Sequence, residues 1–137
     1  MHKIIPFSPP DITDNEIEAV VNVLKSGWIT SGPVNKEFEE EISKYINAKR
    51  VKVLSSATMC MELALKIFGV TEGDEVIVPA YTYASTANVA IHLGAKVVFI
   101  DAADNDFNID LDKLEKAITS KTKAVIAVDI GGKPSDY

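Results

Sequence analysis

The chain has 137 residues, 47% of them hydrophobic, and a formal net charge of −6 at pH 7. This length predicts one domain, or part of a larger one, with enough apolar residues for a real core. The negative charge argues against nucleic-acid or anionic-membrane partners, and the single cysteine, Cys60, excludes an internal disulfide framework. The N-terminal stretch lacks the apolar run of a signal peptide or membrane span, so the expected compartment is the cytoplasm.

Two helical patterns precede the first predicted strand. Thr13 and Glu16 have the spacing of a capping box, which indicates that a helix begins directly after Thr13. Apolar residues then recur every three or four positions, and Gly27 ends the pattern. The sequence therefore predicts a helix over residues 14–26, and a second apolar stripe predicts another over residues 34–46.

From residue 51 onward, short apolar runs alternate with helical patterns. Strands that are apolar on both faces and separated by helices indicate an α/β fold, with a mostly parallel sheet that helices cover on both faces. The helix that carries Cys60 is apolar almost all round, so it should be deeply buried, with Cys60 as a small core residue. The expected strands are residues 51–54, 75–78, 96–100 and 123–128, and the expected helices are residues 58–68, 84–93 and 111–119.

Two serines and an alanine stand where the first of these strands passes into a helix, in the stretch VLSSATM at residues 53–59. In an open parallel sheet, ligands bind beyond the carboxyl ends of the strands. A helix N-terminus there presents unpaired N–H groups and the positive end of its dipole, which suits a phosphate. Ordinary helix capping by Ser55 or Ser56 accounts for the serines equally well.

The next joint on the same edge carries two tyrosines, Tyr81 and Tyr83, in the stretch PAYTYASTAN. A tyrosine at that place can lay the face of its ring on a flat heteroaromatic group. Phosphate donors at one joint and an aromatic ring at the next together favour a phosphorylated aromatic cofactor. The alternative is that one of the two tyrosines packs against the following helix.

A loop between the first two helices, SGWITSGP at residues 26–33, mixes one large ring with hydroxyl groups. Trp28 and Thr30 in this loop fit a substrate contact, although a buried tryptophan that anchors two helices is an equal alternative. No metal site is predicted, because the two histidines lie far apart in the sequence. The acidic stretch at residues 101–110 lacks the glycine and glutamate of a calcium loop.

Five stretches together resemble successive blocks of the DegT/DnrJ/EryC1/StrS family of pyridoxal-phosphate-dependent sugar aminotransferases. They are SGWITSGP, SSATMCMELAL, GDEVIVPAYTYASTANVAIHLGA, FIDAADNDFNID and KTKAVIAVDIGGKPSDY. The resemblance implies the large domain of an aspartate-aminotransferase-type (fold type I) enzyme with a seven-stranded sheet. It also implies transfer of an amino group, mostly from glutamate, to a nucleotide-linked keto-sugar for polysaccharide or other cell-surface glycans. Such enzymes are homodimers with sites at the subunit boundary.

The same resemblance assigns roles to single residues. It implies that pyridoxal 5′-phosphate is the cofactor, that its phosphate binds at the start of the apolar helix, and that a tyrosine stacks on its pyridine ring. The sugar nucleotide would lie near the loop between the first two helices. The residues so assigned are Ser56, Ala57 and Thr58 for the phosphate, Tyr83 for the ring, and Trp28 and Thr30 for the substrate.

Two residues that the family's reaction needs come later in the family than position 137. They are the Schiff-base lysine and the aspartate that pairs with the pyridine nitrogen, so no catalytic residue is assigned here. Lys121, Lys123 and Lys133 are interpreted as surface charges. The chain is therefore interpreted as an incomplete N-terminal portion of the cofactor-binding domain, with helices in residues 1–50 and strand–helix units in residues 51–137, and is expected to be inactive by itself.

Two other functions stay open. One is a pyridoxal-phosphate-dependent sugar dehydratase of the same family, and the other is a non-catalytic fragment that binds a phosphate or a partner. In the family's sheet, the strand expected at residues 51–54 pairs with a strand from late in the sequence. Without it, the isolated chain is expected to self-associate through strand edges or to have a marginal fold.

Overall fold

The computed structural model describes residues 4–6 and 8–137, so part of the N-terminal stretch considered above lies outside the described residues. The chain divides into two compact units, Met1–Val53 and Leu54–Tyr137. Across the described residues, none of the helices combines the length and the apolar character that crossing a bilayer requires.

The first unit contains helices α1 (Asp14–Ser26) and α2 (Pro33–Tyr45). The predicted capping box is present: the Glu16 carboxylate accepts the backbone N–H of Thr13 at 2.6 Å, and Gly27 ends α1 in the left-handed conformation. Helix α2 starts at Pro33, whose ring fixes a helical φ at a position that needs no N–H donor. No residue of either helix is buried, so both apolar stripes lie open within this unit.

The strand predicted at residues 51–54 is wrong: this segment belongs to no sheet. A strand needs a partner strand, and none of the described strands pairs with this segment. Instead the backbone N–H of Val53 donates to the carboxylate of Glu39 on α2 at 3.1 Å. A side chain thus takes the place of one ladder hydrogen bond.

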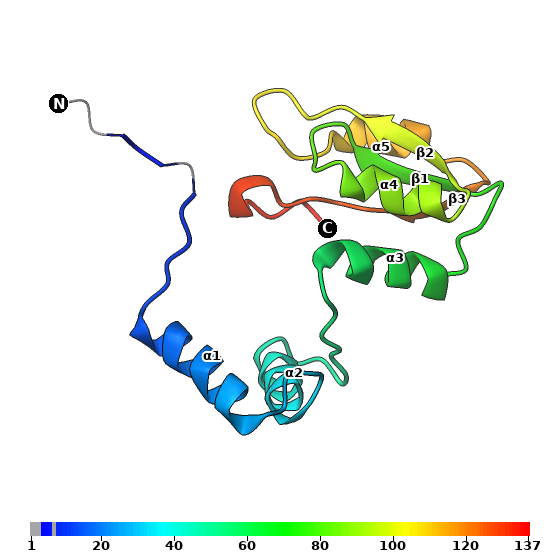
Figure 1. Cartoon of the computed structure of the whole chain (residues 1–137). Coiled ribbons are helices and arrows are strands. Elements are labelled where there is room, and N and C mark those ends of the chain that lie inside the picture. The colour runs from blue at the N-terminus through cyan, green and yellow to red at the C-terminus, as the bar shows by residue number, and fades with distance from the viewer. Residues whose placement is uncertain (1–3, 7) are drawn as a thin grey trace. The chain divides into compact units, whose positions relative to one another are not determined.

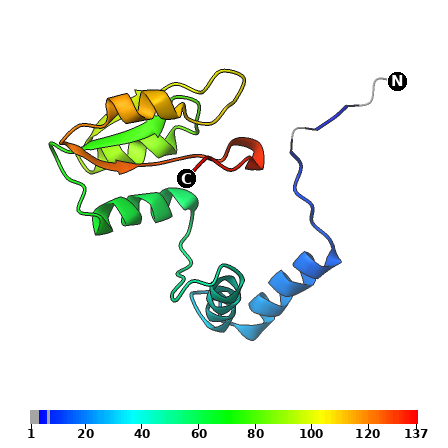
Figure 2. The same cartoon turned by 180° about the vertical axis from the view of Figure 1, so that it is seen from behind.

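The second unit is a parallel sheet with helices on both faces (Figure 1, Figure 2). The three strands stand in the order β2–β1–β3, and β1 pairs in parallel with both neighbours. The predicted α/β arrangement is therefore present for this part of the chain. The elements are α3 (Ala57–Ile67), β1 (Glu75–Pro79), α4 (Ser85–His92), β2 (Lys96–Ile100), α5 (Leu111–Ala117), β3 (Thr122–Val125) and a short 3₁₀ turn η1 (Ile130–Gly132).

The central strand β1 is buried along its whole length. Val76 and Val78 point to the face covered by α3 and α4, where they join a core cluster with Val89. Ile77 points to the opposite face and packs near Leu114 of α5. This alternation explains why the strand is apolar at every position and confirms that helices cover both of its faces.

Helix α3 is much less buried than its composition predicts. Leu65 is its one buried residue, while Met59, Leu63 and Cys60 are exposed. The prediction of a deeply buried helix, with Cys60 in the core, is therefore wrong for this chain. Helix α3 packs against α4 and, through Leu65 and Met61, against the core of the sheet face. No described part of the same unit buries the rest of its apolar surface. An all-round apolar helix requires neighbours on all sides to become buried.

The carboxyl ends of the strands share one edge of the sheet. The loops after β1 and β2, the segment after β3 and the N-terminal end of α3 all lie on the same side of this unit in both views (Figure 1, Figure 2). The two joints at which the sequence analysis expected a ligand are thus on one side, together with the ends of β2 and β3. This side carries the candidate site.

Candidate functional site

The first turn of α3 leaves two backbone donors open. The hydroxyl oxygen of Ser56 accepts the N–H of Met59 at 3.3 Å, so Ser56 is a helix cap, as the simpler interpretation held. The N–H groups of Ala57 and Thr58 make no hydrogen bond to any described residue. They lie at the positive end of the helix dipole, beside a methyl side chain and the Thr58 hydroxyl. This arrangement fits an oxyanion.

The loop after β1 separates its two tyrosines into different surroundings. Tyr81 packs on Phe107, with ring centroids 5.4 Å apart and planes inclined by 35°. Tyr83 is 81% exposed, so its ring is open to a ligand. A hydrogen bond of 2.9 Å between the hydroxyls of Thr82 and Thr86 ties the loop to the first turn of α4. Tyr83 is therefore the more exposed of the two rings, and the one without a ring partner among the described residues.

The open amides and the loop that carries the exposed tyrosine lie at the same end of the second unit. Helices α3 and α4 pack together, and both begin on the side where the strands end (Figure 1). Ser56, Ala57, Thr58 and Tyr83 are thus carried by two neighbouring helix starts. These residues fit a ligand that places a phosphate at the start of α3 and a flat ring near the start of α4.

Trp28 and Thr30 belong to the first unit, in the connection between α1 and α2. The indole Nε1–H of Trp28 donates to the backbone carbonyl of Ser31 at 2.9 Å. A Cβ on Gly32 would come within 2.1 Å of that nitrogen, so only glycine fits beneath the ring. Trp28 is 56% exposed, which contradicts the alternative of a buried anchor, and Thr30 is exposed as well.

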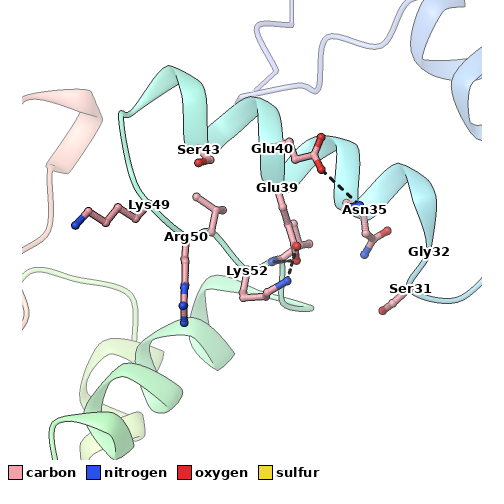
Figure 3. A pocket seen from close by; sticks show the side chains of 12 residues that line it. Ser31, Gly32, Asn35, Glu39, Glu40, Ser43, Lys49, Arg50 and Lys52 are labelled. Atoms are coloured by element: carbon pink, nitrogen blue, oxygen red, sulfur yellow. Dashed lines mark hydrogen bonds and ion pairs between the residues drawn. The ribbon is translucent and has the colours of Figure 1, made fainter.

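A hollow of about 540 Å³ lies in the first unit between α2 and residues 49–53 (Figure 3). Sequence reasoning missed it because its basic residues follow one another on a segment that was expected to enter a strand. Lys52 is turned toward Glu39, and their charged atoms are 2.6 Å apart. The charged side chains that line the hollow are Lys36, Lys49, Arg50, Lys52, Glu39 and Glu40.

Glu39 joins α2 to the segment that leads into the second unit. The hydrogen bond from Lys52, followed by that from the Val53 N–H, lowers the pKa of the Glu39 carboxyl below its ordinary value of 4.5. A lowered pKa in the folded chain means that the contact is complete above the ordinary pKa and is lost as the pH falls through the folded value.

We therefore expect the amide signal of Val53 to shift in an NMR titration as the pH is lowered below about 4.5. The Glu39→Gln variant should lack this shift, because a neutral amide does not titrate. Glu37→Gln, a change at an exposed position on the same helix, should titrate like the unchanged chain. An unchanged Val53 titration in Glu39→Gln would contradict the assignment.

Comparison with known proteins places the chain in a family. Residues 10–137 match the model of the DegT/DnrJ/EryC1/StrS aminotransferase family. The chain belongs to this family. The resemblance stated from five sequence blocks is thereby confirmed.

Relatives extend well beyond the part that this chain matches. The spore coat polysaccharide biosynthesis protein SpsC of Bacillus subtilis (strain 168) is 45% identical over 132 residues, which are 96% of this chain and 34% of SpsC. The UDP-4-amino-4-deoxy-L-arabinose–oxoglutarate aminotransferase of Shewanella sediminis (strain HAW-EB3) is 42% identical over 98% of this chain and 35% of its own length. The chain thus spans about a third of the length of these family members.

Solved structures agree with the fold. The structure of the protein Spr1654 from Streptococcus pneumoniae, in its PLP form, matches with a TM-score of 0.91 and 49% identity, over 96% of this chain and 34% of that one. The E. coli GDP-4-keto-6-deoxy-D-mannose-3-dehydratase with bound hydrated PLP matches with a TM-score of 0.86 and 31% identity, over 95% and 35% of the two chains. The predicted aminotransferase-type α/β fold is therefore confirmed.

Proposed function

We propose that the full-length protein is a pyridoxal-phosphate-dependent aminotransferase, of which this chain is the N-terminal part. It transfers an amino group from glutamate to a nucleotide-linked keto-sugar that is used for polysaccharide or other cell-surface glycans. The observation that carries the proposal is the pair of open N–H groups at Ala57 and Thr58. They lie at the start of α3, on the side of the unit where the loop that carries the exposed Tyr83 leaves β1. The family match supports the same reaction.

Each proposed residue has a distinct physical task. The N–H groups of Ala57 and Thr58 and the Thr58 hydroxyl bind the phosphate, and the Ser56 cap keeps the first turn of α3 in place to present them. Tyr83 lies against the ring and fixes its plane. The bound cofactor supplies the electron sink that amino-group transfer requires.

The substrate side and the remaining machinery are proposed from the family. Trp28 and Thr30 contact the sugar nucleotide from the loop between α1 and α2. The full-length protein is a cytoplasmic homodimer, and its Schiff-base lysine and pyridine-pairing aspartate lie outside the 137 residues. We therefore propose that these residues alone do not catalyse the reaction.

The test is to incubate the full-length protein with pyridoxal 5′-phosphate, glutamate and a nucleotide-linked keto-sugar, and to identify the products by mass spectrometry. An aminotransferase yields an amino sugar nucleotide and an equal amount of 2-oxoglutarate. The match to the E. coli dehydratase makes sugar dehydration the second candidate, and a product that has lost an oxygen without gaining nitrogen would support it. The 137-residue chain, as a control, should form neither product.

A further inference from the structure

Asn108 is a buried polar side chain that holds together two segments of the sheet edge. It lies in the connection between β2 and α5 and is only 7% exposed. Its amide nitrogen donates to the backbone carbonyls of Lys133 and Pro134, each at 3.1 Å. Its amide oxygen accepts the N–H of Ile130 at 3.4 Å. One side chain thus fixes the segment that follows β3 at three backbone points.

The same connection also reaches the tyrosine-bearing loop. Phe107, next to Asn108, packs on Tyr81, two positions before Tyr83. Because β1 stands between β2 and β3, a connection that leaves β2 and contacts the segment after β3 passes the carboxyl end of β1. The conformation of the β2–α5 connection therefore influences the positions of the loop after β1 and of the segment after β3.

Two further contacts reinforce this arrangement. Asp106 forms an ion pair with Lys133, and the hydrogen bond from Lys133 is the main reason why the pKa of Asp106 is lowered. Asp106 also accepts the backbone N–H of Phe107 at 2.7 Å, which fixes the turn that presents Phe107 and Asn108. On the other segment, the Asp129 carboxylate accepts the N–H of Ser135 at 2.9 Å.

We infer that Asn108 is a positioning residue of the cofactor site, acting through Phe107 and the segment after β3 rather than by touching the cofactor. The inference rests on the proposed function. Its physical basis is that a buried amide with both donor hydrogens in use specifies one backbone arrangement. If the side chain were removed, the backbone carbonyls that it pairs with would be left without a hydrogen bond and would carry the full cost of desolvation. Ligands of an open parallel sheet lie at the edge that this amide organises.

The test compares Asn108→Asp with Asn22→Asp in the full-length protein. Aspartate has the shape of asparagine but lacks both donor hydrogens, and its charge faces two carbonyl oxygens. Asn22, exposed on α1, makes no side-chain hydrogen bond that the structure describes and undergoes the same chemical change. If Asn108→Asp does not fold, Asn108→Ala removes the donors without adding the charge.

Two quantities are measured at a temperature where every variant is folded. In Asn108→Asp without cofactor, hydrogen exchange should be about tenfold faster in residues 129–135 and in the loop after β1. The reason is that the loss of one net hydrogen bond to the backbone shifts the local opening equilibrium by about tenfold. The dissociation constant for pyridoxal 5′-phosphate should rise by about tenfold, with a weaker visible circular dichroism of the bound cofactor. Asn22→Asp should match the unchanged protein in both.

Three results would overturn the inference. Unchanged exchange in residues 129–135 would show that Asn108 does not hold the segment. Faster exchange with cofactor affinity within twofold of the control would show a role in folding alone. If the unchanged full-length protein binds no pyridoxal 5′-phosphate, the proposed function fails first and this inference fails with it, a result visible before any variant is made.

Discussion

Replacing Ser56 with aspartate in the full-length protein is expected to leave α3 capped but to weaken binding of pyridoxal 5′-phosphate by about a hundredfold. Aspartate caps helices as well as serine does, so the hydrogen bond to the Met59 N–H is kept. The new carboxylate stands beside the open N–H groups of Ala57 and Thr58. At a few ångströms, and with partial screening by solvent, it repels a phosphate by about 3 kcal/mol, which corresponds to the hundredfold loss in affinity.

The measurement is a titration with pyridoxal 5′-phosphate, followed by its absorbance, together with thermal unfolding of the cofactor-free protein. Ser120→Asp is the control, because Ser120 is exposed in the loop before β3 and the charge change is the same. The affinity of Ser120→Asp for the cofactor should stay within about twofold of that of the unchanged protein, since the new charge is far from the site and screened by solvent. Equal cofactor affinity in the two variants would contradict a phosphate at α3.

The two tyrosines of the loop after β1 are expected to respond in opposite ways to truncation. Tyr83→Ala should weaken cofactor binding by about tenfold and leave stability nearly unchanged, because its ring is 81% exposed and is free to stack on the cofactor. Tyr81→Ala should lower the free energy of unfolding by about 1 kcal/mol, because it loses the ring pair with Phe107.

The phenylalanine variants separate the ring from the hydroxyl. Tyr83→Phe keeps the stacking face, so it should retain most of the cofactor affinity that Tyr83→Ala loses, and Tyr81→Phe should retain stability. Affinity and unfolding are measured on the same preparations of the full-length protein. Cofactor binding that is untouched in Tyr83→Ala would mean that the stacking ring has been assigned to the wrong residue.

The helices could be predicted from the sequence because their signals are local. The capping box of Thr13 and Glu16 forms between residues three positions apart. Asp110 directly precedes the helix predicted over residues 111–119, and its carboxylate caps that helix by accepting the N–H of Lys113 at 3.0 Å. That helix ends at Ala117, earlier than expected, because Ile118 takes an extended conformation. The C-terminal end of a helix is harder to predict where no glycine or proline marks it.

Features that depend on distant parts of a chain could not be predicted in the same way. Residues 51–54 have the apolar composition of a strand, yet a strand forms only beside another strand. Helix α3 has the composition of a buried helix, yet Leu65 is its one buried residue. Composition reports what a segment can pair with or bury against, and the partner must be present for the structure to form.

The candidate site was predicted in part. The sequence pattern indicated a phosphate or simple capping at residues 55–58 and an aromatic face at Tyr81 or Tyr83, and the family resemblance chose Tyr83. The structure adds the contact between Tyr81 and Phe107, which separates the two rings. Asn108 was not singled out, because its partners at residues 130–134 lie more than 20 positions away. A buried asparagine in a loop has no sequence signal that distinguishes it from a turn former.

The most direct test is a crystal structure of the full-length protein with pyridoxal 5′-phosphate. We expect the phosphate oxygens within about 3 Å of the backbone nitrogens of Ala57 and Thr58 and the pyridine ring against Tyr83. Phosphate density elsewhere, for example in the basic hollow beside Lys49 and Arg50, with both amides and Tyr83 free, would contradict the account.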